Sequence, residues 1–308
     1  ELCDQLDAVH TLLDVNDGFG GVASLVLRYL QEEQPKCGKL VVSSMLGEPD
    51  PTAKEGHMET NDGTDTSWAN AALSYASVLS MDVDASIIVP VPLWSVQEAQ
   101  AWTVNRTSRY EVGAVIAAAV ENVSFPYRLR GSGRPSQFLS SLTPSHRPTC
   151  GILEALPLPV VDSAVTDPRA RTREQIGVCE VQSDHFFDLT SMIPVQSNPF
   201  VSVVVRGAEP SRLLRLCEGM HSASLQRSFV DPAPLPLPVP FPQFFSPKVS
   251  SKGLFRPDSV QPARLGGQEV AECPVATCLH ASAAAGRCAP LTQMASILRA
   301  QRRSAWAA

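Results

Sequence analysis

The sequence predicts an α/β fold, in which a parallel β-sheet carries helices on both faces and is followed by a smaller α+β domain. Three observations predict this fold. Short apolar runs typical of buried parallel strands alternate with segments of helical periodicity over residues 11–123. A glycine-rich turn joins the first apolar run to the first helix, as in many α/β folds. The helix over 110–123 is apolar nearly all round, which indicates an element buried in a core.

The N-terminal part predicts a helix end, a strand, a tight turn and a helix. Residues 2–9 are expected to end a helix, and residues 11–15 to form a strand. A helix over 20–33 follows, because apolar side chains recur at helical spacing on one face, and a proline then stops it. The apolar side chains on that face are Leu25, Val26, Tyr29 and Leu30.

The turn between this strand and helix is the candidate site. It consists of Asn16, Asp17, Gly18, Phe19, Gly20 and Gly21. Backbone N–H groups at the start of a helix can hold a phosphate, but Asp17 would meet an incoming anion with negative charge. Asn and Asp are also good N-cap residues that satisfy the helix end by themselves. From the residues alone, we therefore favour a capped helix over a phosphate site.

Further elements follow in order along the chain. Strands are expected at 39–46, 85–91, 151–161 and 200–206, the second of them ending or lying at a sheet edge because of Pro90 and Pro92. Helices are expected at 68–80, 95–102, 110–123, 136–142, 184–192 and 209–222, and residues 173–181 as a helix end running into a strand. Residues 47–67 are expected to be a loop, and residues 249–283 are mixed and polar.

Proline alternates with apolar residues over 231–247, which excludes a helix or a central strand. Two interpretations remain open. The segment is either an extended connection that lies over the core or a docking segment for an aromatic groove on a partner. We favour the connection.

A last helix is expected over 290–306, with Met294, Ile297 and Leu298 apolar. Its cations, Arg299, Arg302 and Arg303, suit the C-terminal end of a helix dipole. They could also touch an anionic membrane surface, although three charges make a weak anchor.

The composition of the chain limits the classes of protein to which it could belong. The 308 residues are 44% hydrophobic and 18% charged, which allows a sizeable core, and the net charge of −6 argues against a nucleic-acid partner. Eight cysteines are too sparse for a disulfide scaffold and indicate a reducing compartment. The glycosylation sequons at Asn105 and Asn122 are treated as chance. No signal peptide or transmembrane run is found, and the start at Glu1 leads us to expect a fragment.

Three motifs carry a resemblance to a known family. Residues 3–35, running from the strand through the glycine turn to the acidic pair and proline, resemble a segment of tubulin. The Asp-Gly-Phe form of the turn is similar to that of the Misato (DML1) family. Residues 85–93 match next, and residues 110–129 contain the Val-Ser-Phe-Pro-Tyr-Arg motif typical of Misato proteins. The resemblance is firm over 2–156, thinner to 208 and weak beyond.

The resemblance implies a tubulin/FtsZ-like fold whose first strands lie upstream of this sequence. Residues 1–130 would then be the C-terminal part of the nucleotide-binding-type domain, including a central helix at 109–123. Residues 131–230 would form a second α+β domain, 231–260 a proline-rich connection, and 261–308 a C-terminal segment with a terminal helix.

The resemblance also implies a function. Misato proteins are similar to tubulin in fold but act in mitochondrial distribution, morphology and inheritance, in the cytoplasm and at the mitochondrial outer membrane. The expected role is a non-enzymatic one that works through protein partners at the mitochondrial surface, with the cytosolic chaperonin or tubulin as further partners. Contact with the membrane is expected to be peripheral at most, and no nucleic acid is expected.

No bound GTP and no GTP hydrolysis are expected. The guanine-contacting Asn of the tubulin central helix falls at or near Ala114, and Tyr110 would be a vestige of the base-stacking aromatic. The region after the central helix is basic, whereas hydrolysis in tubulin-like polymers needs a carboxylate there. Two rival hypotheses remain, namely a GTP-binding polymerising protein and a chaperonin-linked factor in spindle assembly.

Other chemistry finds little support. Cys273, Cys278, His280 and Cys288 match no tight zinc pattern, and free thiols are the favoured interpretation. Asp184-His185 is interpreted as a helix-cap pair, and no nucleophile elbow occurs. We therefore expect neither a metal site nor catalytic residues.

Overall fold

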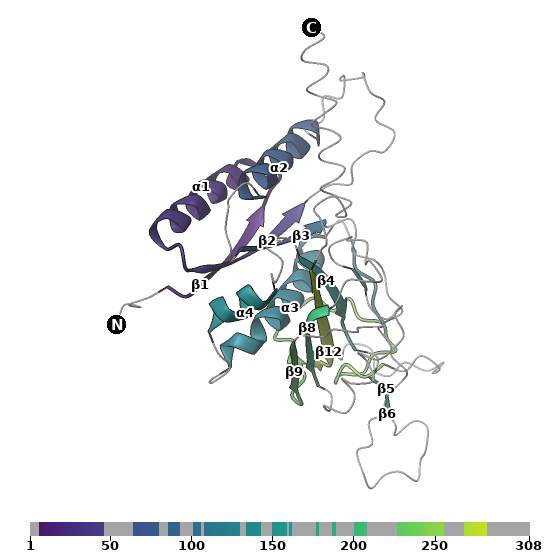
Figure 1. The fold of residues 1–308 in the computed structure, drawn as a ribbon. Helices are drawn as coiled ribbons and strands as arrows, with labels where there is room; N and C mark the ends of the chain where they lie inside the picture. Colours follow the sequence, from purple (N-terminus) through teal and green to yellow (C-terminus); the bar gives the residue numbers. More distant parts are fainter. Residues whose placement is uncertain are drawn as a thin grey trace, which may run out of the picture.

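A computed structural model gives the fold of the chain. It describes residues 6–45, 64–79, 86–92, 101–105, 108–129, 134–142, 150–158, 160–161, 177–178, 187–188, 200–207, 227–255 and 268–281. The two larger β-sheets are joined by one layer of helices (Figure 1), and the predicted α/β class with a parallel sheet is confirmed.

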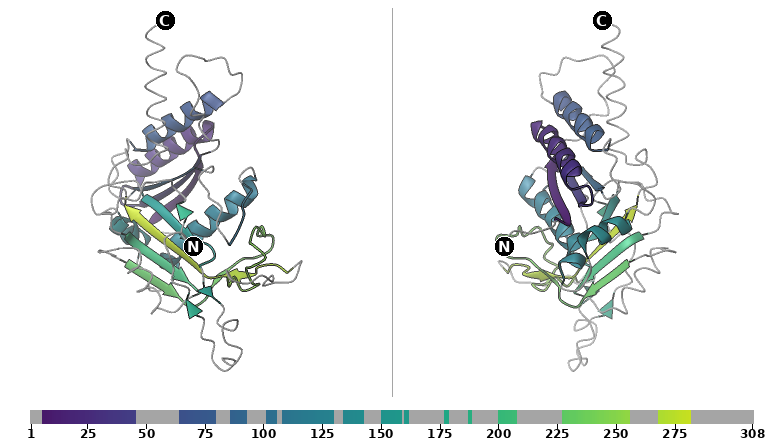
Figure 2. Two further views of the ribbon diagram at one scale, coloured as in Figure 1. Left: turned by 90° about the vertical axis from the view of Figure 1, so that its right-hand side faces the viewer. Right: turned by 60° about the vertical axis from the view of Figure 1, so that its left-hand side comes forward.

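The first sheet has the strand order β1-β2-β3, and both pairings are parallel. Its strands are β1 (Ala8–Asp14), β2 (Gly38–Met45) and β3 (Ser86–Pro92). Helices α1 (Gly18–Glu33) and α2 (Thr64–Leu79) cover one face, while α3 (Arg109–Arg128) and α4 (Pro135–Leu142) lie on the other (Figures 1 and 2). The prolines of β3 sit on an edge strand of this sheet, as predicted.

The second sheet has the order β7-β4-β12-β8-β9, antiparallel except for the β8–β9 pair. Its strands are β4 (Cys150–Ala155), β7 (Phe187–Asp188), β8 (Phe200–Arg206), β9 (Arg227–Asp231) and β12 (Val275–Ala281). Two short pairs complete the described strands, β5 (Val160–Val161) with β6 (Gly177–Val178) and β10 (Leu235–Pro236) with β11 (Glu272–Cys273). Helix α3 packs on β8 and β12 and so joins the two sheets.

Several predicted elements are wrong. Ala8 and Val9 belong to β1, not to a helix end, because their backbones pair with Gly38 and Lys39 of β2. Phe187 and Asp188, predicted within a helix, pair with β4 instead. Tertiary pairing overrides local helical pattern in both places.

Two further differences concern Trp102 and β12. Trp102, predicted to end a helix, forms an isolated antiparallel bridge with Phe245. The central strand β12 lies in a stretch whose sequence pattern is mixed and polar and predicts no strand. The helices predicted for 209–222 and 290–306, and most of the elements predicted for 95–102 and 173–181, lie outside the described residues.

The core continues from α3 beneath the proline-rich segment. Leu235, Leu237, Phe244 and Phe245 of that segment are buried in one cluster with Trp102. Pro236 and Pro238 are exposed next to the buried Leu235 and Leu237, and Val239 and Pro240 are both exposed. These buried side chains place the segment against the core, and its role as a connection stays a prediction.

The predicted domain boundaries stay a prediction. Strand β12, from the predicted C-terminal segment, hydrogen-bonds with β4 and β8 of the predicted second domain. Within the ranges that the structure describes, no helix is both long and apolar enough to cross a lipid bilayer.

Candidate functional site

The N-terminus of α1 is closed by a carboxylate from the chain itself. Asp17 is the N-cap residue, and its Oδ1 accepts a hydrogen bond of 2.9 Å from the Phe19 amide. The Asn16 amide donates to Asp14 Oδ1 at 3.0 Å. The predicted N-cap role of Asp17 is confirmed, and its carboxylate engages the Phe19 amide, one of the amides at this helix end that could hold an anion.

The helix begins two residues earlier than predicted, so that Gly18 and Phe19 join Gly20 and Gly21 in the first turn of α1. None of these glycines has a positive φ, so the backbone does not require glycine for a left-handed turn. At Gly20 a Cβ atom would lie 2.0 Å from Ser74 Oγ on α2. Gly20 therefore permits a close approach of two helices, and its role is packing.

Asn16 is fixed from the side of α2. Its carbonyl oxygen accepts a hydrogen bond of 3.3 Å from Asn70 Nδ2, and its side chain is buried. The turn before α1 is thus tied to the neighbouring helix on one side and to its own carboxylates on the other. A phosphate there would displace an existing hydrogen bond and face the charge of Asp17.

Tyr110 lies in the first turn of α3, which Ser108 caps by accepting from the Glu111 amide at 3.3 Å. Its ring is half exposed, and its hydroxyl donates to the carbonyl of Pro240 in the proline-rich segment. Ala114 follows one turn later and offers no polar side-chain atom. Tyr110 therefore contacts the proline-rich segment, whereas Asn16 contacts α2, and the two predicted site regions have separate partners.

The Phe125–Arg128 run connects α3 to both sheets. The Arg206 guanidinium of β8 lies 4.4 Å from the centre of the Phe125 ring. The Tyr127 hydroxyl is hydrogen-bonded to His10 Nε2 on β1. Arg128 Nη2 reaches Glu121 Oε1 at 2.6 Å and the Glu121 carbonyl at 3.0 Å. The motif thus has an internal structural role that sequence reasoning did not find.

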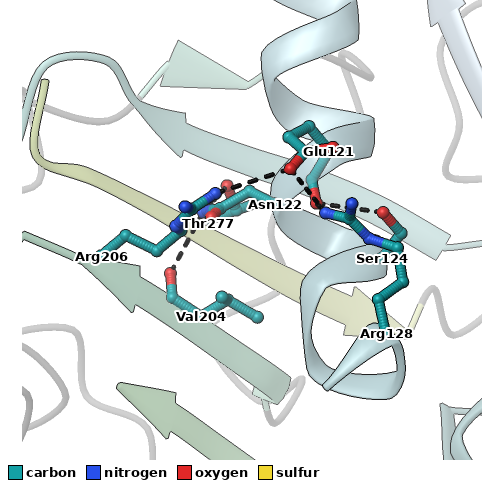
Figure 3. Close-up of polar contacts among 7 residues, drawn as sticks. All are labelled: Glu121, Asn122, Ser124, Arg128, Val204, Arg206 and Thr277. Atoms are coloured by element: carbon teal, nitrogen blue, oxygen red, sulfur yellow. Dashed lines mark hydrogen bonds and ion pairs between the residues drawn. The ribbon is translucent and has the colours of Figure 1, made fainter. Parts of the chain in front are cut away.

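A polar network lies where α3 meets the second sheet (Figure 3). Asn122 Nδ2 donates to Thr277 Oγ1 on β12 at 2.8 Å and to the Val204 carbonyl on β8 at 3.5 Å. Arg206 Nη1 forms an ion pair of 3.6 Å with Glu121 Oε1. Asn122 is fully buried, so its sequon is not on the surface. The signal available in the sequence was the polar pair Glu121 and Asn122, which follows the apolar run 112–120 of this helix.

Three buried groups have shifted pKa values, namely Glu154 and Arg206 on the second sheet and Cys273 on β11. Glu154 lies opposite Thr277 in the β4–β12 register and is fully buried, so desolvation raises its pKa well above the ordinary value. Burial, and the neighbouring Glu154, raise the pKa of the Cys273 thiol. Burial lowers the pKa of Arg206, although Asp231 and Glu121 oppose that effect.

Cys273 and Cys278 are buried cysteines that form no disulfide bond, on β11 and β12 respectively. Among the residues that the structure describes, no three His, Cys, Asp or Glu side chains form a group that could hold a metal ion. Cys288 lies outside that part of the chain. At the predicted site before α1, the described residues make helix-cap hydrogen bonds and packing contacts with other parts of the same chain.

The chain is similar to Protein misato homolog 1 from Danio rerio. The two are 27% identical over 317 aligned residues, which cover 93% of this chain and 51% of that protein. The chain thus spans about half the length of the curated relative it matches. No family model matches the chain. The match confirms the Misato-like resemblance that the three motifs predicted, and the parallel sheet with its two helical layers agrees with the tubulin-like fold that it implies.

Proposed function

We propose that this chain works in a non-enzymatic, tubulin-like regulator of mitochondrial distribution, morphology and inheritance, which acts through protein contacts. The Misato-like sequence supports the tubulin-like part of this proposal. The observation that carries the non-enzymatic part is the Asp17 carboxylate on the first amides of α1.

Asp17 acts in two ways against a nucleotide. Its Oδ1 already accepts from the Phe19 amide, so a phosphate oxygen would have to displace it. Its charge repels a phosphate at the distance where the helix dipole would otherwise attract one. Tyr110 adds a third argument, because its hydroxyl is engaged by Pro240 of the proline-rich segment.

The region after α3 supports the same proposal. Hydrolysis would need a carboxylate that positions water, and the motif at the end of α3 supplies Arg128 instead. Glu121, one turn before the motif, is paired with Arg128 and Arg206.

Partners and location follow from the resemblance. We propose protein partners at the mitochondrial surface, with the cytosolic chaperonin or tubulin as further candidates, and no resident cofactor. The protein would divide between the cytoplasm and the mitochondrial outer membrane, with peripheral contact at most.

Titration of the full natural protein that contains this chain with fluorescent GTP tests the non-enzymatic part. We expect no binding at micromolar concentrations and no phosphate release above a blank. The matched variant is Asp17→Ser, which keeps an N-cap oxygen but removes the charge and should show any latent anion affinity. Micromolar GTP binding with turnover by the unaltered protein would overturn the proposal in favour of a polymerising GTPase.

Depletion in cells tests the mitochondrial part. The proposal expects altered mitochondrial distribution while spindles stay normal, and rescue by the Asp17→Ser variant. Abnormal spindles with normal mitochondria would instead favour the chaperonin-linked factor in spindle assembly.

A further inference from the structure

A buried polar row crosses the second sheet beneath α3, in an interface that is otherwise largely apolar. Glu154 on β4 lies opposite Thr277 on β12, and Thr277 lies opposite Val204 on β8, so the three residues share one face of the sheet. Asn122 of α3 reaches two members of this row (Figure 3), namely Thr277 Oγ1 at 2.8 Å and the Val204 carbonyl at 3.5 Å. The row therefore lies directly under α3.

Glu154 is a fully buried carboxyl group in this row. Among the residues that the structure describes, neither of its carboxyl oxygens has a hydrogen-bond partner. The Arg206 guanidinium of β8 is engaged elsewhere, 3.6 Å from Glu121 Oε1 and 4.4 Å from the centre of the Phe125 ring. Because a buried carboxylate is costly without a paired cation or several donors, this setting favours the protonated, neutral acid.

Asn122 has a buried acceptor that is not used. Its Nδ2 makes both hydrogen bonds to the sheet, whereas its Oδ1 is without a partner in the described part of the chain. The Thr277 hydroxyl accepts from Asn122 and also lies across from Glu154, so the amide and the carboxyl group are neighbours of the same hydroxyl. A protonated carboxyl group has the O–H donor that Asn122 Oδ1 needs.

We propose that Glu154 keeps a proton at neutral pH and closes a ring of hydrogen bonds with Asn122 and Thr277. Asn122 Nδ2 donates to Thr277 Oγ1. The Thr277 hydroxyl then donates to one oxygen of Glu154, and the protonated oxygen of Glu154 donates to Asn122 Oδ1. Each of the three side chains donates once and accepts once, so the ring ties α3 to β4 as well as to β12. Such a closed polar network fixes the position of α3 on the sheet more narrowly than apolar contacts do.

The titratable and charged groups nearby are compatible with a neutral acid. Burial raises the pKa of Glu154 well above its ordinary value, and the Thr277 side chain opposes this rise from a geometry outside that of a full hydrogen bond. Burial, and then the nearby Glu154, raise the pKa of the Cys273 thiol, so that group is neutral at pH 7. Glu272 adds negative charge next to Cys273, and Arg206 adds positive charge.

Infrared spectroscopy of the full natural protein that contains this chain tests for the proton. Ordinary Asp and Glu side chains are ionised at pH 7. The difference spectrum between the unaltered protein and Glu154→Gln should therefore show one carbonyl band of a protonated carboxylic acid. A difference spectrum without that band would overturn the proposal.

The frequency of the same band tests the ring. Thr277→Val should move the band to higher frequency, because it removes the donor to the carbonyl oxygen of Glu154. Ser202→Ala is the matched control, since it removes another buried hydroxyl that has no hydrogen-bond partner among the described residues, and it should leave the band in place. An unmoved band in Thr277→Val, or an equal shift in Ser202→Ala, would refute the ring.

Hydrogen exchange tests the hold of the ring on α3. Glu154→Met keeps a side chain of similar length without the donor, so peptides from α3 and β12 should exchange several-fold faster, while peptides from β1 and β2 serve as the internal reference. Glu154→Gln offers an N–H group to Asn122 Oδ1 and an oxygen to Thr277, and its exchange should match that of the unaltered protein. Equal exchange in the two variants would show that Glu154 acts only through its shape and would refute the ring.

Discussion

The hydroxyl of Tyr127, in the last turn of α3, is hydrogen-bonded to Nε2 of His10 on the edge strand β1, and the two rings meet edge-on with centroids 5.3 Å apart. The Tyr127 ring also packs against the Phe138 ring of α4, with ring centroids 5.2 Å apart. Two residues before Tyr127, Phe125 contacts Arg206 of the second sheet. The end of α3 therefore fixes both sheets at once.

We predict that Tyr127→Phe lowers the free energy of unfolding by about 0.5–1.5 kcal/mol, because it removes one hydrogen bond and keeps the ring. Chemical denaturation at pH 7.5 measures this change. Tyr29→Phe is the matched control on an exposed tyrosine, and its effect should stay within about 0.5 kcal/mol. Equal effects of both changes would contradict the role given to the Tyr127 hydroxyl.

Stability should fall as the pH drops below about 6.5, the ordinary pKa of histidine. Burial, and then the nearby Arg128, lower the pKa of His10 in the folded protein. The folded state therefore binds fewer protons than the unfolded state, and stability is lost as the pH falls through the folded pKa. Denaturation midpoints from pH 8 to pH 5 measure the slope. His10→Gln should reduce it, and an unchanged slope would argue against His10 as its source.

Gly20→Ala should destabilise the chain by about 1–3 kcal/mol, because the new Cβ would lie 2.0 Å from Ser74 Oγ and 2.8 Å from Ser74 Cβ. Gly21→Ala is the matched control, since a Cβ atom at that position would have no neighbouring atom within 4 Å. It should stabilise α1 by up to about 1 kcal/mol through helix propensity. Thermal melts measure both, and Ser74→Gly should rescue Gly20→Ala. A stabilising Gly20→Ala change would refute the close helix contact.

Glu154→Gln should stabilise the chain at neutral pH. Burial raises the pKa of Glu154, so the folded state holds a proton that the unfolded state releases above about pH 4.3. The stability contribution is fully present below that pH and is lost as the pH rises toward the folded pKa. Glutamine keeps the shape without this penalty, so the gain should grow from pH 4 to pH 8 in urea denaturation. A less stable variant at pH 8 would mean that the native carboxylate is charged and paired.

Asn122→Ala should cost about 1–3 kcal/mol, because it leaves buried Thr277 Oγ1 without its donor. A double-mutant cycle with Thr277→Val measures the coupling, which should exceed about 0.5 kcal/mol if the 2.8 Å bond matters. Strictly additive effects would show that α3 is held to β12 by apolar packing alone.

The alternation of strands and helices in the first sheet could be predicted because it depends on local patterns. Apolar runs indicate β2 and β3, the polar N-cap indicates the start of α1, and the apolar circumference indicates α3. The cap role of Asp17 belongs to the same class, since a side chain that bonds an amide two residues away needs no distant partner.

The second sheet could not be predicted as well because its strands depend on pairing across long stretches of chain. Strand β12 is bounded by β4 and β8, and Phe187–Asp188 become strand only by pairing with Leu153 and Glu154. The spacing of apolar residues along a helix shows that they share one face, but it does not show whether that face is buried. Leu25, Val26 and Tyr29 share a face of α1 and are exposed.

From the sequence alone came the α/β class, the capped start of α1 and the family resemblance, because each depends on residues that are close together in the chain. The tertiary structure decided that Gly20 serves a helix contact, that the Phe125–Arg128 run joins two sheets, and that the proline-rich segment covers the core. Each of these depends on a partner more than 50 residues away on the chain, such as Ser74, Arg206 or Trp102. The local sequence pattern does not show which distant residues will be neighbours, because these contacts form only when helices and sheets bury their apolar faces against one another.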